Sequence, residues 1–157
     1  MIQLTERANI AFARLGKVQI AAFAEIEGLD NRDLQEFIDT ASADYLKNGA
    51  VEVFLVYAHK VPLTAMQRHM LVEATERIKA TFKANAVITE SVLVVAMIKF
   101  LQLFVNVKIN AFTPAQMNKA IDWLREFTDF DKREANLLLR QMIDRLRVAR
   151  KARNLDK

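Results

Sequence analysis

The side chains of this sequence that are best placed to do chemistry are the arginines and lysines near its end. Residues 131–157 hold nine Lys and Arg residues against four Asp and Glu residues. On a helix, Arg133, Arg140, Arg147 and Lys151 would lie within about 40° of one another. Arginine binds phosphate oxygens bidentately, so this stripe predicts a helix that binds the nucleic-acid backbone without base-specific readout. The candidate nucleic-acid-binding residues are Arg133, Arg140, Arg147, Arg150, Lys151 and Arg153.

Two other interpretations of the basic stripe stay open. Cations near the C-terminus of a helix offset its dipole, so the stripe could be an ordinary solvated face, and Asp144 lies within it and weakens it. The stripe could also dock on an acidic protein surface, since residues 20–59 hold eight acidic residues against two basic ones. If the partner is nucleic acid, Lys79 and Lys83 are further candidates for phosphate contacts.

Residues for catalysis or metal binding are not evident. His69 and Glu73 are one helical turn apart, but a metal site needs at least three converging ligands. The chain has no Cys, which excludes disulfides, a thiolate nucleophile and a Cys-based zinc site. Its three Gly residues are isolated, so no glycine-rich phosphate loop is present. We therefore expect no catalytic residues, no cofactor, no metal and a protein that is not an enzyme.

The apolar content indicates an alternative function. At 52%, it exceeds the roughly 45–50% that is usual for soluble domains. Homodimer interfaces are more apolar than ordinary surface, so part of the excess is explained by an interface. The alternative hypothesis is a protein-protein interaction adaptor or inhibitor that self-associates through an apolar helical face. A homo-oligomer is expected in either case.

The Gly, Pro and helix-capping residues of the sequence favour helices as the elements that carry these side chains. Three Gly and two Pro are too few for the turns of a β-sandwich or barrel. Helix starts are signalled at four places: Asp30, Thr64 with Gln67, Thr113 with Pro114, and Asp131 with Glu134.

Hydrophobic periodicity then predicts an all-α fold, a compact bundle of about six helices. A helix over 89–109 is the expected central apolar element, and the last helix is the basic one. Other helices are expected at 4–27, 30–48, 64–85 and 113–127. Two segments, 50–61 and 104–110, also have strand composition, and we expect helix in both.

The domain and location follow from length and termini. A chain of 157 residues makes a single domain, 1–157, and residues 152–157 are expected to fray because they carry charge on all sides. The first residues lack the pattern of a secretory signal. Lys99, Gln102 and Asn106 interrupt the most apolar stretch, so no membrane span is expected. We expect a cytoplasmic protein.

Overall fold

The computed structural model describes residues 1–24, 28–58, 63–103 and 106–155. Its centre is a six-stranded mixed sheet, in the order β1-β2-β3-β4-β5-β6. The strands are β1 (Gln3–Leu4), β2 (Ile10–Leu15), β3 (Val18–Phe23), β4 (Val53–Tyr57), β5 (Ala84–Ile88) and β6 (Lys108–Phe112). The helices are α1 (Asn31–Asn48), α2 (Ala65–Ile78), α3 (Val92–Leu101), α4 (Met117–Leu124), which follows the 3-10 turn η1 (Pro114–Gln116), and α5 (Lys132–Leu155).

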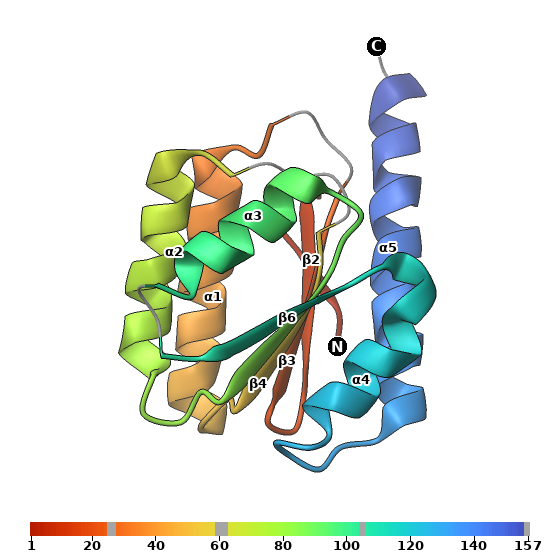
Figure 1. Cartoon of the computed structure of the whole chain (residues 1–157). Coiled ribbons are helices and arrows are strands. Elements are labelled where there is room, and N and C mark those ends of the chain that lie inside the picture. Colours follow the sequence, from red (N-terminus) through yellow and green to blue (C-terminus); the bar gives the residue numbers. More distant parts are fainter. Residues whose placement is uncertain (25–27, 59–62, 104–105, 156–157) are drawn as a thin grey trace.

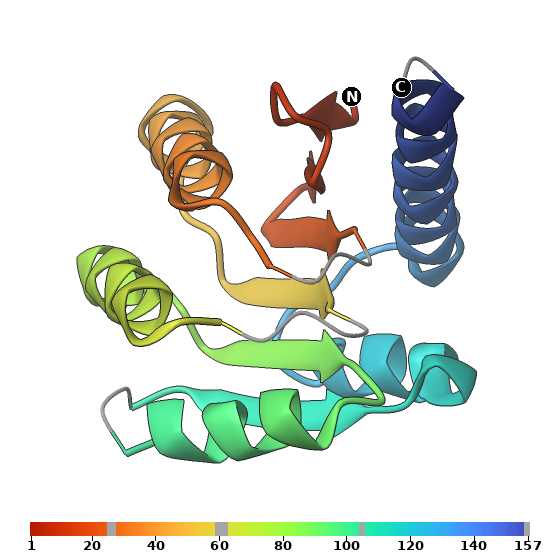
Figure 2. The same cartoon turned by 90° about the horizontal axis from the view of Figure 1, so that it is seen from above.

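Strand direction divides the sheet into two parts. β1, β2 and β3 pair antiparallel, and β3 to β6 pair parallel. Each parallel connection contains a helix, as the crossover between parallel strands requires. Figures 1 and 2 show three layers, with α1, α2 and α3 on one face of the sheet and α4 and α5 on the other.

A separate apolar core fills the space on each face of the sheet. The core under α4 and α5 contains Ile20, Leu55, Ile121, Leu139 and Met142, all fully buried. The core under α1, α2 and α3 is built on Ile10, Phe12, Leu34, Phe37 and Val94. Phe37 makes edge contacts with Phe12 and Phe23 at ring centroid distances of 5.4 and 6.2 Å.

The predicted all-α bundle is wrong, and the expected helix at 4–27 shows the physical reason. This segment forms β1, β2 and β3. All six residues of β3 are buried and only Gln19 is polar, so the strand shows no alternation of period two. Alanines at 11, 13, 21 and 22 add strong helix propensity, which the sheet overrides. Gly16 has a φ of 57° and begins the two-residue loop of the β2-β3 hairpin, where a glycine is favoured.

The two ambiguous segments contain strands, so the preference for helix is wrong in both. β4 lies within 50–61, and β6 begins within 104–110, while residues 59–61 and 104–105 lie outside the described residues. The expected central helix at 89–109 is the shorter α3 at the end of the sheet (Figure 2). The helix expected at 64–85 ends at Ile78 and is followed by β5.

The predicted helix starts are confirmed. The Asp30 carboxylate accepts a hydrogen bond from the Arg32 amide, and Thr64 and Gln67 form a reciprocal capping box. Asp131 accepts from the Glu134 amide at 2.8 Å and begins α5. α5 remains helical to Leu155, with residues 156 and 157 outside the described part. Within the described residues, no helix combines the length and apolarity that crossing a bilayer requires.

Candidate functional site

The predicted basic residues all lie on α5, but the structure does not bring them together as one site. Arg133 and Arg140 lie in its first half, where Arg140 donates to the Asn136 side chain at 2.6 Å. Arg153 donates to the carbonyl of Glu6 at 3.0 Å. The remaining three, Arg147, Arg150 and Lys151, line one pocket of about 210 Å³.

This pocket, which we call the cationic pocket, lies between the C-terminal half of α5 and the ends of β3 and β4. Its other lining residues are Phe23, Ala24, Tyr57, Ile143, Leu146 and Asn154. Phe23 and Tyr57 are the last residues of their strands, so the pocket opens at the carboxyl ends of two parallel strands. Figure 1 shows α5 continuing past these strand ends.

The acidic residues of segment 20–59 that the structure describes have partners within the fold, while residues 25 and 27 lie outside the described part. Asp33 is buried and accepts from Asn9, and Asp30 pairs with Arg7. The Glu36 carboxylate accepts from the backbone amide of Glu6 at 3.1 and 3.2 Å. This segment therefore uses much of its charge to stabilise local structure.

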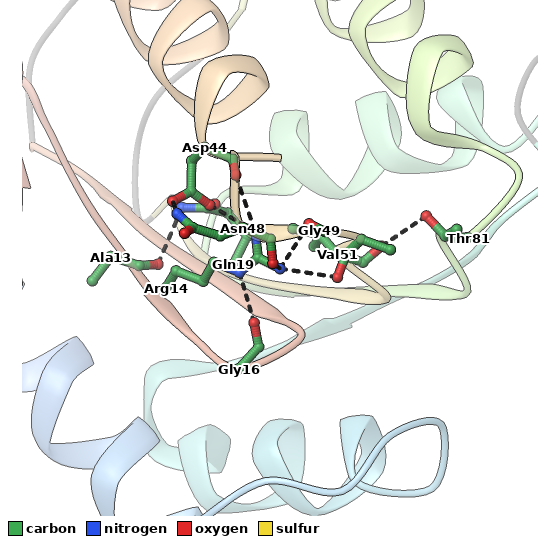
Figure 3. A network of polar contacts seen from close by, with 10 residues as sticks. Ala13, Arg14, Gly16, Gln19, Asp44, Asn48, Gly49, Val51 and Thr81 are labelled. Carbon is green, nitrogen blue, oxygen red and sulfur yellow. Dashed lines mark hydrogen bonds and ion pairs between the residues drawn. The ribbon is translucent and has the colours of Figure 1, made fainter. Parts of the chain in front are cut away.

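Arg14 is the centre of the polar network shown in Figure 3. Its guanidinium donates to the Asp44 carboxylate at 2.8 Å and to the carbonyls of Gly49 and Ala50 at 2.8 and 3.0 Å. These are orphan carbonyls at the C-terminus of α1, which need a donor. Burial raises the pKa of Asp44, but the hydrogen bonds from Arg14 and Asn48 outweigh it and lower that pKa overall. The network holds α1 against the hairpin and leaves no reactive group exposed.

Glu52 forms a second charged cluster just before β4. Its carboxylate accepts from Lys17 at 2.9 Å and from Lys83 at 3.2 Å. Hydrogen bonds from Lys17, Thr128 and Lys83 lower the pKa of Glu52 to about 2, although burial opposes this shift. Lys83 is thus engaged within the fold, and Lys79 pairs with Glu76 at 2.7 Å. Both lysines therefore have local partners, in contrast to the cations of the cationic pocket.

The outer side of α3 presents an apolar surface that the sequence reasoning missed. Leu93, Ala96 and Phe100 are exposed on this helix, and Leu103 follows it, with exposed fractions of 68% for Leu93, 47% for Phe100 and 78% for Leu103. We call these four residues the α3 seam. Their spacing of three and four residues is visible in the sequence, but the prediction for 89–109 is only a central apolar helix, with none of these residues assigned to an exposed face.

An apolar cavity of about 110 Å³ lies beneath α3. Val94, Met97 and Ile98 line it from α3, and Phe54, Val87 and Leu71 line it from the sheet and α2. Asn85 also lines this cavity, and its Oδ1 atom is buried without a hydrogen-bond partner in the described structure. A buried acceptor without a donor raises the free energy of the folded state, so a donor placed in the cavity beside the Oδ1 atom of Asn85 would be stabilising.

The histidines do not form a metal site in the described structure. His69 lies 3.2 Å from the Glu73 carboxylate on the exposed side of α2. No group of three His, Cys, Asp or Glu side chains among the described residues is arranged to hold a metal ion. His59 lies outside the described residues.

The sheet order, the parallel crossovers and the two helical layers define a three-layered α/β domain. The chain belongs to the SpoIIAA-like family, whose model matches residues 18–125. No curated protein matches the sequence. The match covers β3 to α4, and β1, β2 and α5 lie outside it.

The family assignment corrects the predicted function. SpoIIAA-like domains interact with partner proteins, and nothing in the family or the fold supports a nucleic-acid-associated helix. The hypothesis of backbone binding to nucleic acid is therefore wrong, and the alternative, a protein-interaction adaptor, fits better.

Proposed function

We propose that this protein is a non-enzymatic protein-interaction module of the cytoplasm and that its docking surface is the α3 seam. The observation that carries the proposal is the exposure of large apolar side chains in one row on a helix at the end of the molecule. Exposed apolar rows of this kind mark interaction sites, because leaving them in water costs free energy. Membership of a family whose domains bind partner proteins supports the same conclusion.

The proposed occupant of the α3 seam is a second copy of this chain. Leu93, Ala96, Phe100 and Leu103 follow the alternating spacing of three and four residues with which helices pair. Lys99 is the only charged residue in α3, and Arg68 of α2 lies over the Phe100 ring at 5.7 Å, so each copy brings two cations near the α3 seam. Ala96 is small and lets the two helix axes come close. A self-complementary face of this type suits a two-fold dimer.

Light scattering coupled to size-exclusion chromatography tests the proposal with the purified full chain. The wild type is expected to be a dimer that dissociates on dilution, and Leu93→Glu with Phe100→Glu is expected to be a monomer. Leu46→Glu is the matched control, because Leu46 is 84% exposed but lies on α1, away from the seam. It should leave the dimer intact.

Three results would overturn the proposed occupant. The wild type could be monomeric at high concentration, the Leu46 variant could dissociate as readily as the seam variant, or the seam could bind phosphatidylcholine vesicles while the protein stays monomeric. The last result would assign the seam to a lipid surface. Circular dichroism of each variant establishes that it is folded before its mass is interpreted.

A second candidate function is the binding of a small apolar molecule in the cavity beneath α3. The unpartnered Oδ1 atom of Asn85 favours it, because a ligand with one hydrogen-bond donor would satisfy this acceptor. Phenol and toluene have nearly the same shape but differ in that donor. Phenol is expected to raise the thermal midpoint more than toluene, and Asn85→Leu is expected to reverse this order. Equal effects of both ligands on both proteins would exclude this candidate.

A further inference from the structure

We infer that the cationic pocket binds a small organic anion that carries an apolar body about the size of an aromatic ring. This site is separate from the proposed docking surface, because α5 and α3 lie on opposite faces of the sheet (Figure 2). The inference therefore goes beyond the proposed function and does not depend on it.

The inner part of the cationic pocket is apolar. Phe23 and Ala24 are buried at the end of β3, Tyr57 is buried at the end of β4, and Leu146 is buried on α5. With Ile143, these residues form a floor that excludes water from part of any bound molecule. The pocket volume of about 210 Å³ accommodates an aromatic ring, because an engineered cavity of about 150 Å³ in another protein holds benzene.

The rim of the cationic pocket carries unneutralised positive charge. Arg150 and Lys151 make no ion pair among the described residues. Arg147 has Asp144 at 3.9 Å, which is a long and exposed contact and neutralises it only in part. A group with two or more acceptor oxygens, such as a carboxylate or a phosphate, matches the fork of an arginine.

The pocket lies beside the carboxyl ends of two parallel strands, where β3 and β4 place Phe23 and Tyr57 against the C-terminal half of α5. The cations near the C-terminus of α5 also offset the helix dipole, as an ordinary helix would require. That role needs no apolar floor and no pocket, so the combination of floor and rim distinguishes a binding site from a capped helix.

The test is calorimetric titration of the full chain with three probes. Phenyl phosphate has both the ring and the anion, benzyl alcohol has only the ring, and inorganic phosphate has only the anion. Phenyl phosphate is expected to bind about tenfold more tightly than either of the others, and benzoate distinguishes a carboxylate from a phosphate preference. NMR shifts on phenyl phosphate binding are expected at Tyr57, Ile143 and Leu146 and not on α3.

Paired variants of α5 decide whether the pocket or the overall charge is responsible. Arg147→Gln with Arg150→Gln should weaken phenyl phosphate binding about tenfold. Arg133→Gln with Arg140→Gln removes the same charge from the same helix outside the pocket and should leave the affinity unchanged. Equal binding of phenyl phosphate and inorganic phosphate, equal losses in the two double variants, or no binding at millimolar phenyl phosphate would each overturn the inference.

Discussion

α3 and α5 cover opposite faces of the same sheet, yet they present different chemistry to solvent. α5 buries a stripe that includes Ala135, Leu139, Met142 and Leu146, and its outer side carries cations. α3 buries Val94 and Ile98, and its outer side carries the apolar α3 seam. A charged outer face is well solvated without a partner, whereas an apolar outer face is stabilised when a partner covers it. The comparison therefore assigns protein docking to α3 and anion binding to α5.

The largest expected difference is in the free energy of unfolding, between a substitution on the buried face of α5 and one on the exposed face of α3. Met142→Ala should lower the free energy of unfolding by about 3 kcal/mol, because Met142 is fully buried and its removal leaves a cavity. Leu93→Ala should change it by no more than about 0.5 kcal/mol. Urea unfolding followed by circular dichroism, below the concentration at which dimers form, measures both. Equal losses would mean that the outer side of α3 is packed within the monomer.

A smaller difference is expected between an arginine that is held by the fold and one that is free on α5. Arg14→Met removes the donor to the C-terminal carbonyls of α1 and to Asp44, and should cost about 2 kcal/mol of unfolding free energy. Arg150→Met is the matched change and should cost about 0.5 kcal/mol or less. Chemical unfolding of the two variants provides the comparison. A stability loss at Arg150 as large as that at Arg14 would make the α5 cations structural.

The pH dependence of the free energy of unfolding tests the role of Glu52, a charged residue that is held by the fold. Its pKa is lowered from 4.5 to about 2 in the folded state, so its contribution to stability is complete above about pH 4.5 and is lost as the pH falls toward 2. Glu52→Gln should lower the unfolding free energy by about 1 kcal/mol at pH 7 and reduce the loss of stability below pH 4.5. Unfolding midpoints from pH 2 to 7 measure the difference, and parallel wild-type and variant curves would contradict it.

The smallest predicted effect lies within the cationic pocket. Asp144→Asn removes the carboxylate that partly neutralises Arg147 and should increase phenyl phosphate affinity about twofold. Asp129→Asn is the matched control, because Asp129 pairs with Arg125 at the same distance of 3.9 Å but lies outside the pocket. Calorimetric titration at low salt measures both variants. An equal gain from the control would indicate a general charge effect.

The parts of the fold that could be predicted are those that local chemistry determines. The caps at Asp30, Thr64 and Asp131 depend on residues within one turn, and the structure confirms each of them. The strands β3 and β5 could not be predicted because they are short and largely buried, and each has one polar residue, Gln19 or Asn85, which is too few to show an alternation. Apolar residues spaced by three and four then suggested a helix where a sheet forms.

The candidate sites could be predicted only in part, because local spacing shows which residues share a helix face but not what that face contacts. The helical stripe on α5 correctly placed Arg147 and Lys151 on one side of a helix, but only the fold shows that they face Phe23 and Tyr57 from distant strands. The α3 seam could not be recognised because exposure is not encoded in spacing. A row of apolar residues has the same pattern whether it faces a core or solvent.

The sequence by itself determined the helix starts at Asp30, Thr64 and Asp131, the absence of cysteine chemistry and the concentration of positive charge in α5. The tertiary structure decided that the apolar segments between those helices pair as a sheet, because pairing satisfies the backbone of segments that are buried on both faces. It also decided which charges remain available. Arg14, Lys17 and Lys83 have partners within the fold. Arg150 and Lys151 make no ion pair in the described structure, and they belong to the C-terminal part of α5, the helix whose end extends beyond the sheet (Figure 1).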